Sequence, residues 1–288
     1  MAILTRFLSI QLLVAASVSC GAQELLPDLP LAGHADEISR SQRVTGGTTT
    51  PWVLQLRGSE SDAVRALAVS PDGSILVAGQ FEADIEIGFD MLVSAGDSDA
   101  FLARLSPLGE PIWAVRIGGP GFDAASGVAV DRDGNATVVG EFSGSVTFEG
   151  GRLSAKGGRD LFAIAFTPDG VARWSSAWGG AGWETVDAAA AAPDGGVLVA
   201  GARVGEVAIA DRSRPDADVD PTMDVDVDVD ADADGFLTRI APGGARTWTV
   251  RLGGRGWDQA HAIAVGPDGT IAVAGSFADR MSIGRTGL

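Results

Sequence analysis

The chain has 288 residues, of which 45% are hydrophobic and 20% are charged, so it carries enough apolar surface to bury a core. Its 38 acidic residues outnumber its 21 basic ones, and the net charge of -17 argues against nucleic acid or an anionic membrane surface as the main partner. A single cysteine excludes an internal disulfide. The 40 glycines and 13 prolines favour many strands and turns over long helices.

Residues 1–22 have the pattern of a signal peptide. One cation, Arg6, precedes a 12-residue, largely apolar stretch at 7–18, which small residues follow. Twelve helical residues at about 1.5 Å each are too short for a hydrocarbon core of about 30 Å, and no later stretch reaches the length of a span. We therefore predict an exported protein without a transmembrane helix in its mature chain. Residues 23–51, which contain Pro, Gly and three successive Thr, are expected to form a flexible tether.

The cysteine of this chain directly follows the apolar stretch, in Ser17-Val18-Ser19-Cys20. This segment resembles the bacterial lipoprotein box, in which a lipidated cysteine becomes the mature N-terminus. The resemblance implies lipidation of Cys20, and Gly21 after it is similar to the residue of the outer-membrane class. We therefore expect an outer-membrane or cell-surface lipoprotein that meets the membrane through its lipid anchor alone. Cleavage after Ala22 is the alternative, and it predicts a secreted or periplasmic protein without Cys20.

A repeat of 61 residues organises the rest of the chain. Trp52, Trp113 and Trp174 are 61 residues apart, and Trp248 follows after 74. We divide this region into units 52–112, 113–173, 174–247 and 248–288, of which the third contains an acidic insertion at 211–233 and the fourth is truncated. Further landmarks share the register, namely Asp72-Gly73, Asp133-Gly134, Asp194-Gly195 and Asp268-Gly269, the glycines Gly79, Gly140, Gly201 and Gly275, and the phenylalanines Phe101, Phe162 and Phe236.

Each unit is predicted to form four to six short strands. The segment from Trp113 to Ile117 alternates bulky apolar with small or polar residues, as a strand with one buried face does. Apolar runs at 127–130 and 136–140 flank an Asp-Gly turn, where glycine supplies the positive φ of the reversal. One unit alone buries too little surface to be stable, so the units must stack. Radial stacking gives a β-propeller, and linear stacking gives a β solenoid.

The landmarks follow one another as Trp-x-x-x-x-Gly-Gly, Asp, an apolar run with Asp-Gly, Gly-x-Phe and Asp-x-Phe, and this order resembles the bacterial β-propeller repeat called SBBP. The resemblance covers residues 52–288 and implies an all-β propeller fold. The chain departs from the repeat at Arg57-Gly58, at Glu184 and at Ala202-Arg203. Members of that family close a larger ring, so we expect an incomplete or open ring and a fragment of a longer array.

The acidic insertion is the most distinctive segment of the chain. From Asp211 to Asp234 it contains ten aspartates. Asp230, Asp232 and Asp234 match the first half of a calcium loop, because carboxylates at alternate positions suit a cation with roughly six to eight ligands. Ala241 stands where such a loop has its bidentate glutamate. The alternative, which we favour, is a self-repelling solvated loop without a specific cation.

Aromatic residues recur after the Gly-Gly turn as Phe122, Trp183 and Trp257. On a loop at one rim of the propeller, flat aromatic faces can stack on sugars or bind another protein, so these residues are candidate ligand contacts. The alternative, which we favour on general grounds, is that they fill the space between neighbouring units. An acid occupies the next position of every unit, and its recurrence suits loop capping better than catalysis. These acids are Asp62, Asp123, Glu184 and Asp258.

Patterns typical of catalysis are weak in this sequence. His261 occupies the position that Arg65, Ser126 and Asp187 hold in other units, and His34 lies in the tether, so neither is expected in a Ser-His-Asp triad. We predict a non-catalytic interaction or scaffold module of the cell envelope, without a cofactor, that binds an unknown protein or glycan. The alternatives are a secreted propeller enzyme with a site in its central channel and a calcium-dependent adhesion protein.

Overall fold

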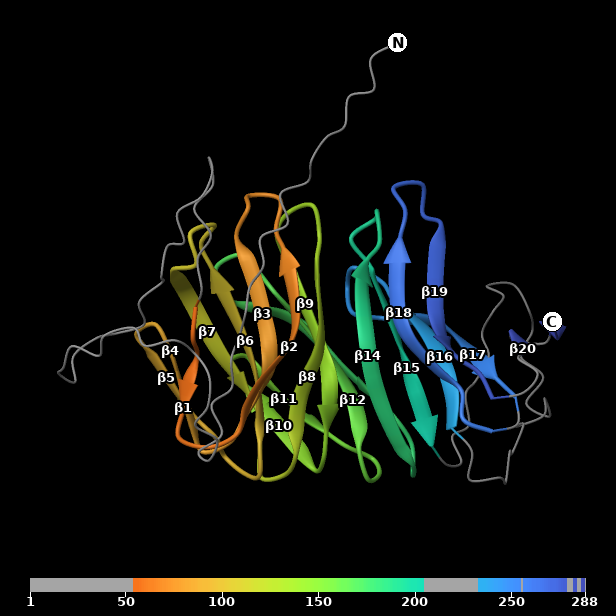
Figure 1. Ribbon diagram of the computed structural model, residues 1–288, viewed down its shortest axis with the longest axis horizontal. Coiled ribbons are helices and arrows are strands. Elements are labelled where there is room, and N and C mark those ends of the chain that lie inside the picture. The colour runs from red at the N-terminus through yellow and green to blue at the C-terminus, as the bar shows by residue number, and fades with distance from the viewer. Residues whose placement is uncertain (1–53, 205–232, 255, 279–281, 284–285, 288) are drawn as a thin grey trace, which may run out of the picture.

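The computed structural model describes residues 54–204, 233–254, 256–278, 282–283 and 286–287 (Figure 1). The regular structure of this part is entirely β, and it contains no helix long and apolar enough to cross a membrane. The predicted signal peptide with Cys20, the tether at 23–51 and nearly all of the insertion at 211–233 lie outside the described residues.

Four antiparallel sheets, which we name blades I to IV, succeed one another along the described chain. Blade I has the strand order β2-β3-β6-β7, and blade II has the order β8-β9-β12-β13. Blade III has the order β14-β15-β16-β17 and continues into β20 and β21, whereas blade IV consists of β18 and β19. The bounds are β2 (Asp62–Val69), β3 (Ile75–Phe81), β6 (Asp99–Leu105), β7 (Pro111–Ile117), β8 (Asp123–Val130), β9 (Ala136–Phe142), β12 (Asp160–Phe166), β13 (Ala172–Trp178), β14 (Trp183–Ala191), β15 (Val197–Val204), β16 (Ala233–Ile240), β17 (Arg246–Gly253), β18 (Gln259–Val265), β19 (Ile271–Ser276), β20 (Ser282–Ile283) and β21 (Thr286–Gly287).

Short hairpins connect the second and third strands of blades I and II. Their strands are β4 (Asp84–Ile87) with β5 (Asp90–Val93), and β10 (Ser145–Phe148) with β11 (Gly151–Ser154). A further strand, β1 (Arg57–Gly58), pairs with β4, and Gly118 forms an equivalent bridge to Thr147 on β10. In both places the segment that precedes a blade forms backbone hydrogen bonds with the hairpin of that blade, which connects successive parts of the chain.

The tryptophan strand that opens the second, third and fourth sequence units is the last strand of the preceding blade, whereas Trp52 lies outside the described residues. Trp113 lies on β7 opposite Arg104 on β6, and Trp248 lies on β17 opposite Arg239 on β16. Trp174 has the same place on β13. A unit therefore contributes its first strand to one blade and its remaining strands to the next.

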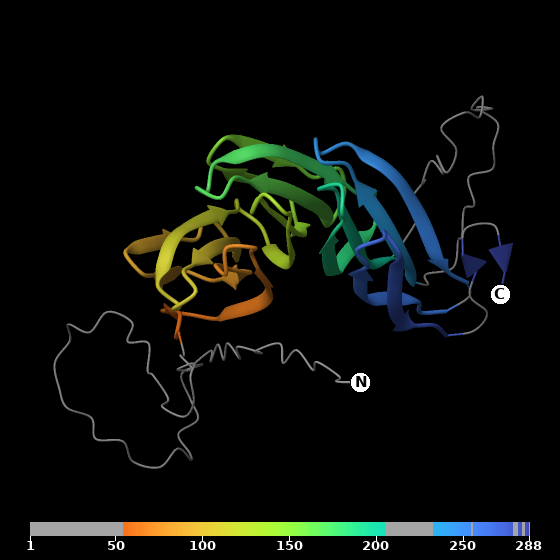
Figure 2. The same cartoon turned by 90° about the horizontal axis from the view of Figure 1, so that it is seen from above.

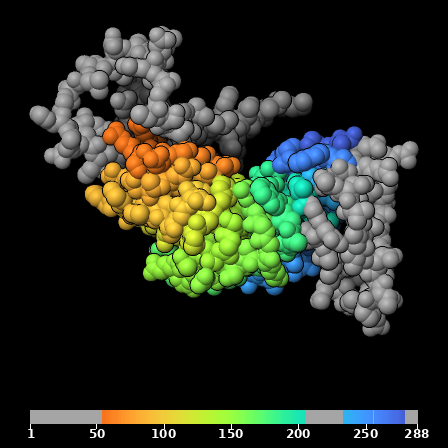
Figure 3. All heavy atoms as spheres, turned by 90° about the horizontal axis from the view of Figure 1, so that it is seen from below, coloured from red at the N-terminus to blue at the C-terminus, as the bar shows by residue number. Residues whose placement is uncertain are grey.

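The blades follow an arc, with the first strand of each blade on the concave side (Figure 2). We call these strands, β2, β8, β14 and β18, the inner strands, and each packs against the next in chain order. The space-filling view from below shows the same order of blades along the arc (Figure 3). The prediction of an all-β propeller with an open ring is confirmed for the described residues.

Asp-Gly pairs form the turns between the first and second strands, as predicted. Their glycines, Gly73, Gly134, Gly195 and Gly269, have φ values from 79° to 85°, where a residue with a Cβ is strained. In blade I the side chain of Asp72 accepts a 3.0 Å hydrogen bond from the N–H of Ser74, which closes the turn.

Recurring phenylalanines fill the cores of the blades. Phe101 and Phe162 are fully buried, and Phe236 is 3% exposed. Phe101 meets Phe81 edge to face with 6.4 Å between ring centroids, and Phe162 meets Phe142 in the same way at 6.2 Å. Apolar clusters also join neighbouring blades, and the one between blades I and II includes Leu76, Leu102, Val138 and Ile164. Burial of each large apolar side chain contributes about 1.5–3 kcal/mol, so the blades stabilise one another.

Candidate functional site

Each inner strand contains a β-bulge near its start. The pairing of β2 with β3 passes from Val64 to Ala66, so that Arg65 is the extra residue. The other inner strands skip one residue at the same register position. A bulge re-aims the side chain of its extra residue, so each blade presents one unit-specific side chain there. The extra residues are Arg65, Ser126, Asp187 and His261.

A recurring glycine makes these bulges sterically possible. A Cβ built on any of these glycines would lie 1.9–2.0 Å from a carbonyl oxygen of the inner strand, far inside contact distance. No other residue fits there without movement of the backbone. The single-glycine landmark of the repeat therefore marks the bulge, and its members are Gly79, Gly140, Gly201 and Gly275.

Three of the bulge residues line a pocket that spans blades I to IV near the boundary of blades II and III. The volume of the pocket is about 420 Å³. Two guanidinium groups and two carboxylates contribute to its wall, so it suits a polar ligand. We name it the inner-face pocket, and it is lined by Arg65, Phe122, Ser126, Glu141, Arg159, Thr185, Val186, Asp187 and Gln259.

Arg159 contacts two aromatic rings at this pocket. Its guanidinium carbon lies 4.0 Å from the ring centre of Phe122 and 5.0 Å from that of Trp183. Its Nη1 atom also lies 3.6 Å from Oε2 of Glu141. Cation–π contacts contribute about 0.5–1 kcal/mol each at exposed sites, so the rings restrict the orientation of the guanidinium before any ligand binds.

Glu141 is buried beside Arg159, with 7% of the residue exposed. Its Oε1 atom accepts a 2.9 Å hydrogen bond from the backbone N–H of Val186, which links blade II to blade III. Burial raises the pKa of Glu141 above its usual value, although that hydrogen bond and the charges of Arg159 and Arg65 oppose the increase. The protonation of Glu141 is therefore sensitive to any charge that enters the pocket.

Side chains of blades III and IV meet next to the pocket. Nε2 of Gln259 donates a 2.8 Å hydrogen bond to Oδ2 of Asp187. His261 places Nε2 3.1 Å from Oγ of Ser276 and Nδ1 3.9 Å from Oδ2 of Asp187. Serine, histidine and aspartate are the residue types of a catalytic triad. However, the 3.9 Å between His261 and Asp187 is too long for a hydrogen bond, and half of the His261 side chain is exposed. Sequence reasoning missed this grouping because its members come from three strands of two blades.

The three aromatic residues predicted to contact a ligand differ in their exposure to solvent. Trp183 is 58% exposed and Trp257 is 64% exposed, so packing between blades, the interpretation favoured from the sequence, does not account for them. Phe122 is half-buried against the guanidinium of Arg159. Ligand contact stays a prediction for all three residues. Phe122 lines the inner-face pocket, and Trp183 contacts Arg159, which is part of the pocket wall.

Two of the recurring acids cap loops, as expected from the repeat. Oδ2 of Asp123 accepts a 2.7 Å hydrogen bond from the N–H of Gly119, and Oδ2 of Asp258 accepts one of 2.6 Å from Gly254. Glu184 differs, since Arg203 lies opposite it on β15, and the positive charge of Arg203 and the backbone N–H of Gly180 partly oppose the effect of burial on its pKa. Burial raises the pKa of Glu184 to about 7.

Of the predicted calcium ligands, Asp234 lies on β16, while Asp230 and Asp232 lie outside the described residues. Oδ2 of Asp234 is 2.7 Å from Nε of Arg251 and 3.9 Å from Nη2 of Arg203. In the described ranges no group of three or more His, Cys, Asp or Glu side chains is placed to hold a metal ion. Two guanidinium groups beside Asp234 disfavour a cation at that carboxylate.

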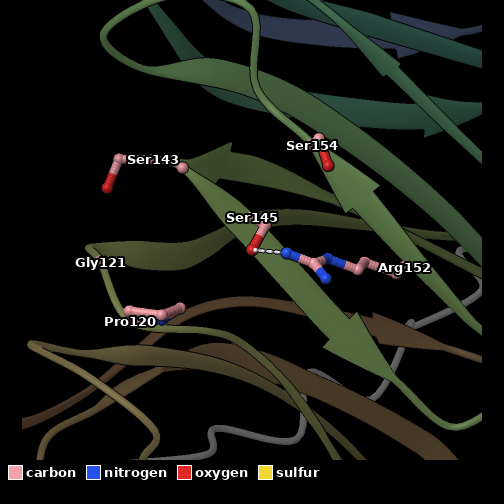
Figure 4. Close-up of a pocket in the computed structure, with 7 residues that line it drawn as sticks. Pro120, Gly121, Ser143, Ser145, Arg152 and Ser154 are labelled. Carbon is pink, nitrogen blue, oxygen red and sulfur yellow. Dashed lines mark hydrogen bonds between the residues drawn. The ribbon is translucent and has the colours of Figure 1, made fainter.

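A second pocket lies beside the β10–β11 hairpin of blade II (Figure 4). Its volume is about 470 Å³, and it is more open to solvent than the inner-face pocket. Nη2 of Arg152 donates a 3.0 Å hydrogen bond to Oγ of Ser145. This pocket has one charged side chain and no aromatic residue in its lining, so the inner-face pocket is the stronger candidate. The lining residues are Pro120, Gly121, Ser143, Gly144, Ser145, Arg152 and Ser154.

Comparisons with known proteins agree with a repeat fold and identify no family. No protein-family model matches the chain. An uncharacterized WD repeat-containing protein of Acanthamoeba polyphaga mimivirus is 28% identical over 99 residues, which are 32% of this chain and 7% of that protein. A solved chimera of ACO and RPE65 has a TM-score of 0.35 and 11% identity over 75% of this chain and 50% of its own, too low for any argument. The described blades, their repeats and the WD-repeat relative together identify a β-propeller-like repeat protein with an open ring.

Proposed function

We propose that this chain is a non-catalytic binding or scaffold module of the bacterial cell envelope, which holds a protein or glycan partner on its concave side. The convergence of unit-specific bulge residues beside the half-buried ring of Phe122 and the exposed ring of Trp183 carries the proposal. Repeat proteins use such concave surfaces for binding, and side chains that differ between units at one register position provide specificity there.

The composition of the inner-face pocket supports recognition of a partner. Arginine and aromatic side chains dominate the binding energy of many interfaces, and Arg159 contacts the rings of Phe122 and Trp183. Asp187 and Gln259 add hydrogen-bonding groups at the other side of the pocket. A sugar ring or a peptide can use this combination of flat faces and polar contacts.

Two arginine variants test the binding proposal. Arg159→Ala removes the guanidinium that contacts the two rings, and Arg152→Ala removes one at the more open pocket of the same blade. The mature chain is tested for binding to isolated envelope fractions and to a glycan array. We expect binding at least about tenfold weaker for Arg159→Ala, equivalent to about 1.4 kcal/mol, and unchanged for Arg152→Ala. Equal binding by all three proteins would contradict the proposal.

Export and lipid anchoring belong to the same proposal and rest on residues 1–22 and on Cys20. The full precursor is expressed with a labelled fatty acid, beside a Cys20→Ala variant. We expect label in the natural chain and none in the variant. An unlabelled natural chain that is still exported would favour cleavage after Ala22 and a soluble secreted form.

The enzyme alternative has one observation in its favour, the grouping of Ser276, His261 and Asp187. An activated serine reacts with a fluorophosphonate probe, and mass spectrometry locates the modified residue. We expect no labelling of Ser276. Labelling that disappears in His261→Ala would replace the binding proposal with a hydrolytic one.

A further inference from the structure

The β4–β5 hairpin of blade I lies beside the outer strand β7 (Figure 1) and carries apolar side chains on its solvent side. Ile85 and Leu92 pack into the core of blade I, so alternate residues of the two strands face solvent. On β5 these are Met91, which is 63% exposed, and Val93, which is 60% exposed. Phe89 in the turn is 94% exposed. The three side chains form an apolar row along the hairpin.

The apolar row continues onto β7. A Cβ built on Gly88 at the tip of the hairpin would lie 2.6 Å from Cβ of Pro111. Oδ2 of Asp90 accepts a 3.2 Å hydrogen bond from the N–H of Ala114, so the tip lies against β7. Ile112 is the extra residue of a bulge at the start of β7, and it is 56% exposed. Single exposed apolar residues are normal on a protein surface, but a group of them with a polar border marks an interaction site.

Acidic side chains border the apolar row. On β4, Asp84 and Glu86 alternate with buried isoleucines and therefore face the same side as the row. Ser59 donates a hydrogen bond to Asp84, which leaves the charge of that carboxylate in place, and Arg57 on β1 lies opposite Glu86 and offsets one charge. Each acid lies directly opposite an apolar residue of β5, with Cβ atoms about 4.5–5.5 Å apart. The opposed pairs are Glu86 with Met91 and Asp84 with Val93.

The hairpin of blade II has the same pairing but different side chains. Thr147 lies opposite Arg152 as Glu86 lies opposite Met91. The blade II hairpin forms without apolar or acidic residues at the equivalent solvent-facing positions, so the fold does not require them in blade I. We name the six blade I residues the hairpin surface. They are Asp84, Glu86, Phe89, Met91, Val93 and Ile112, and the residues 61 positions later are Ser145, Thr147, Gly150, Arg152, Ser154 and Arg173.

We propose that the hairpin surface binds a polypeptide segment that combines apolar side chains with Lys or Arg. Its apolar row buries the apolar side chains of the segment, and Asp84 and Glu86 attract the cations. An anionic lipid surface is disfavoured, as is a second copy of this chain docked through the same surface, because each would bring negative charge to these acids. The hairpin surface adjoins the outer strand, whereas the inner-face pocket adjoins the inner strands, so this proposal does not rest on the binding function proposed above.

Random short peptides displayed on phage are the probe for this surface. The library is depleted on a variant with Phe89→Ser, Met91→Ser and Val93→Ser and is then selected on the mature natural chain. The variant keeps every charge of the surface, and its Tm should lie within a few degrees of the natural value because the three side chains are exposed. We expect the selected peptides to combine Lys or Arg with apolar residues. Acidic peptides, or no enrichment over the starting library, would overturn the proposal.

Fluorescence anisotropy with a selected peptide then locates its site. Met91→Arg, which copies blade II, is expected to weaken binding at least about tenfold, and so is the pair Asp84→Ser with Glu86→Thr. The matched control is Asp226→Asn with Asp228→Asn, which removes as many charges from the acidic insertion and should bind like the natural chain. Arg159→Ala at the inner-face pocket should also bind like the natural chain.

Equal binding by all of these proteins would overturn the proposal. Two further measurements test the other occupants of the hairpin surface. The natural chain is mixed with vesicles of phosphatidylcholine and phosphatidylglycerol, and its oligomeric state is measured by sedimentation. We expect neither vesicle binding nor dimers that depend on the three apolar side chains. Vesicle binding or dimers that the triple serine variant loses would assign the surface to lipid or to a second copy and would overturn the proposal.

Discussion

Blades II and III have different side chains at three equivalent positions, which lie in a row across the first three strands of each blade. In both blades three residues lie directly opposite one another on the first, second and third strands. In blade II a buried aromatic ring separates two acids, whereas in blade III a guanidinium separates them. The recurring glycines and turns hold the backbone in both cases, so the side chains of the row are free to differ. The rows are Asp123, Phe142 and Asp160, and Glu184, Arg203 and Asp234.

The largest effect on stability is expected from Phe142→Ala. Phe142 is fully buried and packs edge to face on Phe162, so its truncation should reduce the free energy of unfolding by about 3–5 kcal/mol. Arg203→Ala in the equivalent position should cost about 1–3 kcal/mol, because it removes a 3.9 Å ion pair with Asp234 rather than a packed ring. Urea denaturation measures both. Equal losses would show that the two rows are energetically equivalent.

The next largest loss of stability is expected from substitution of the glycines opposite the bulges. A Cβ at Gly140 would lie 2.0 Å from the carbonyl oxygen of Ala124, so Gly140→Ala should cost about 3 kcal/mol. Gly201→Ala in blade III, where the Cβ would lie 2.0 Å from the carbonyl oxygen of Thr185, should cost as much. Gly144→Ala is the control, since nothing lies within 4 Å and its φ of +69° alone costs about 1 kcal/mol. If all three variants unfold alike, the bulges are not as described.

A smaller change in the free energy of unfolding, for each pH unit, is expected from titration of the buried acids. Burial raises the pKa of Asp123 to about 8 and that of Asp62 to about 6. The folded chain therefore holds these protons more tightly than the unfolded chain, whose carboxyls titrate near pH 4. The associated stability is fully present below about pH 4 and is lost as the pH rises through 6 and 8, by up to about 1.4 kcal/mol per unit and group.

This pH dependence is measured as Tm between pH 5 and 8 in the presence of a chelator. Tm is expected to fall across this range. Asp123→Asn, which carries no charge, should make the fall shallower, whereas Asp133→Asn at an exposed turn should leave it unchanged. A Tm that rises with pH, or an unchanged slope in Asp123→Asn, would contradict the assignment.

The smallest effect on stability is expected for the exposed tryptophans. Trp183→Ala should cost less than about 1 kcal/mol, since 58% of the residue is exposed and a cation–π contact with Arg159 contributes only about 0.5–1 kcal/mol. Its effect on partner binding should nevertheless exceed that of Trp257→Ala, which is equally accessible but has no contact with Arg159 among those described. The envelope-binding assay described above distinguishes them, and equal binding by the two variants would remove Trp183 from the site.

The repeats predicted the fold because their landmarks act locally. Asp-Gly pairs form turns through the conformational freedom of glycine, and the apolar runs predicted at 127–130 and 136–140 lie in β8 and β9. The bulges were not predicted, because a bulge depends on which residue of the neighbouring strand lies opposite. The variation at the position of His261 was visible, but only the pairing of strands brings these residues together.

The ligand-contact residues were predicted in part. Phe122 and Trp183 were identified by their recurrence after the Gly-Gly turn, although packing was the favoured interpretation. Arg159 was missed, because it precedes a recurring acid and carries no motif of its own. Its role follows from parallel bridges that place residue 98 beside Phe122 and Arg159 beside Trp183. Such contacts between blades have no counterpart in the pattern of a single unit.

The offset between sequence units and blades determines where such an array can be divided. A fragment that ends with the second unit at residue 173 retains two of the seven residues of β13 (Ala172–Trp178) and uncovers the hydrogen-bonding edge of β12. A fragment that ends in the link after Trp178 keeps every ladder of blade II intact. Recombinant pieces of this chain should therefore be cut in the links between blades, even though the units read from the tryptophans suggest the other boundary.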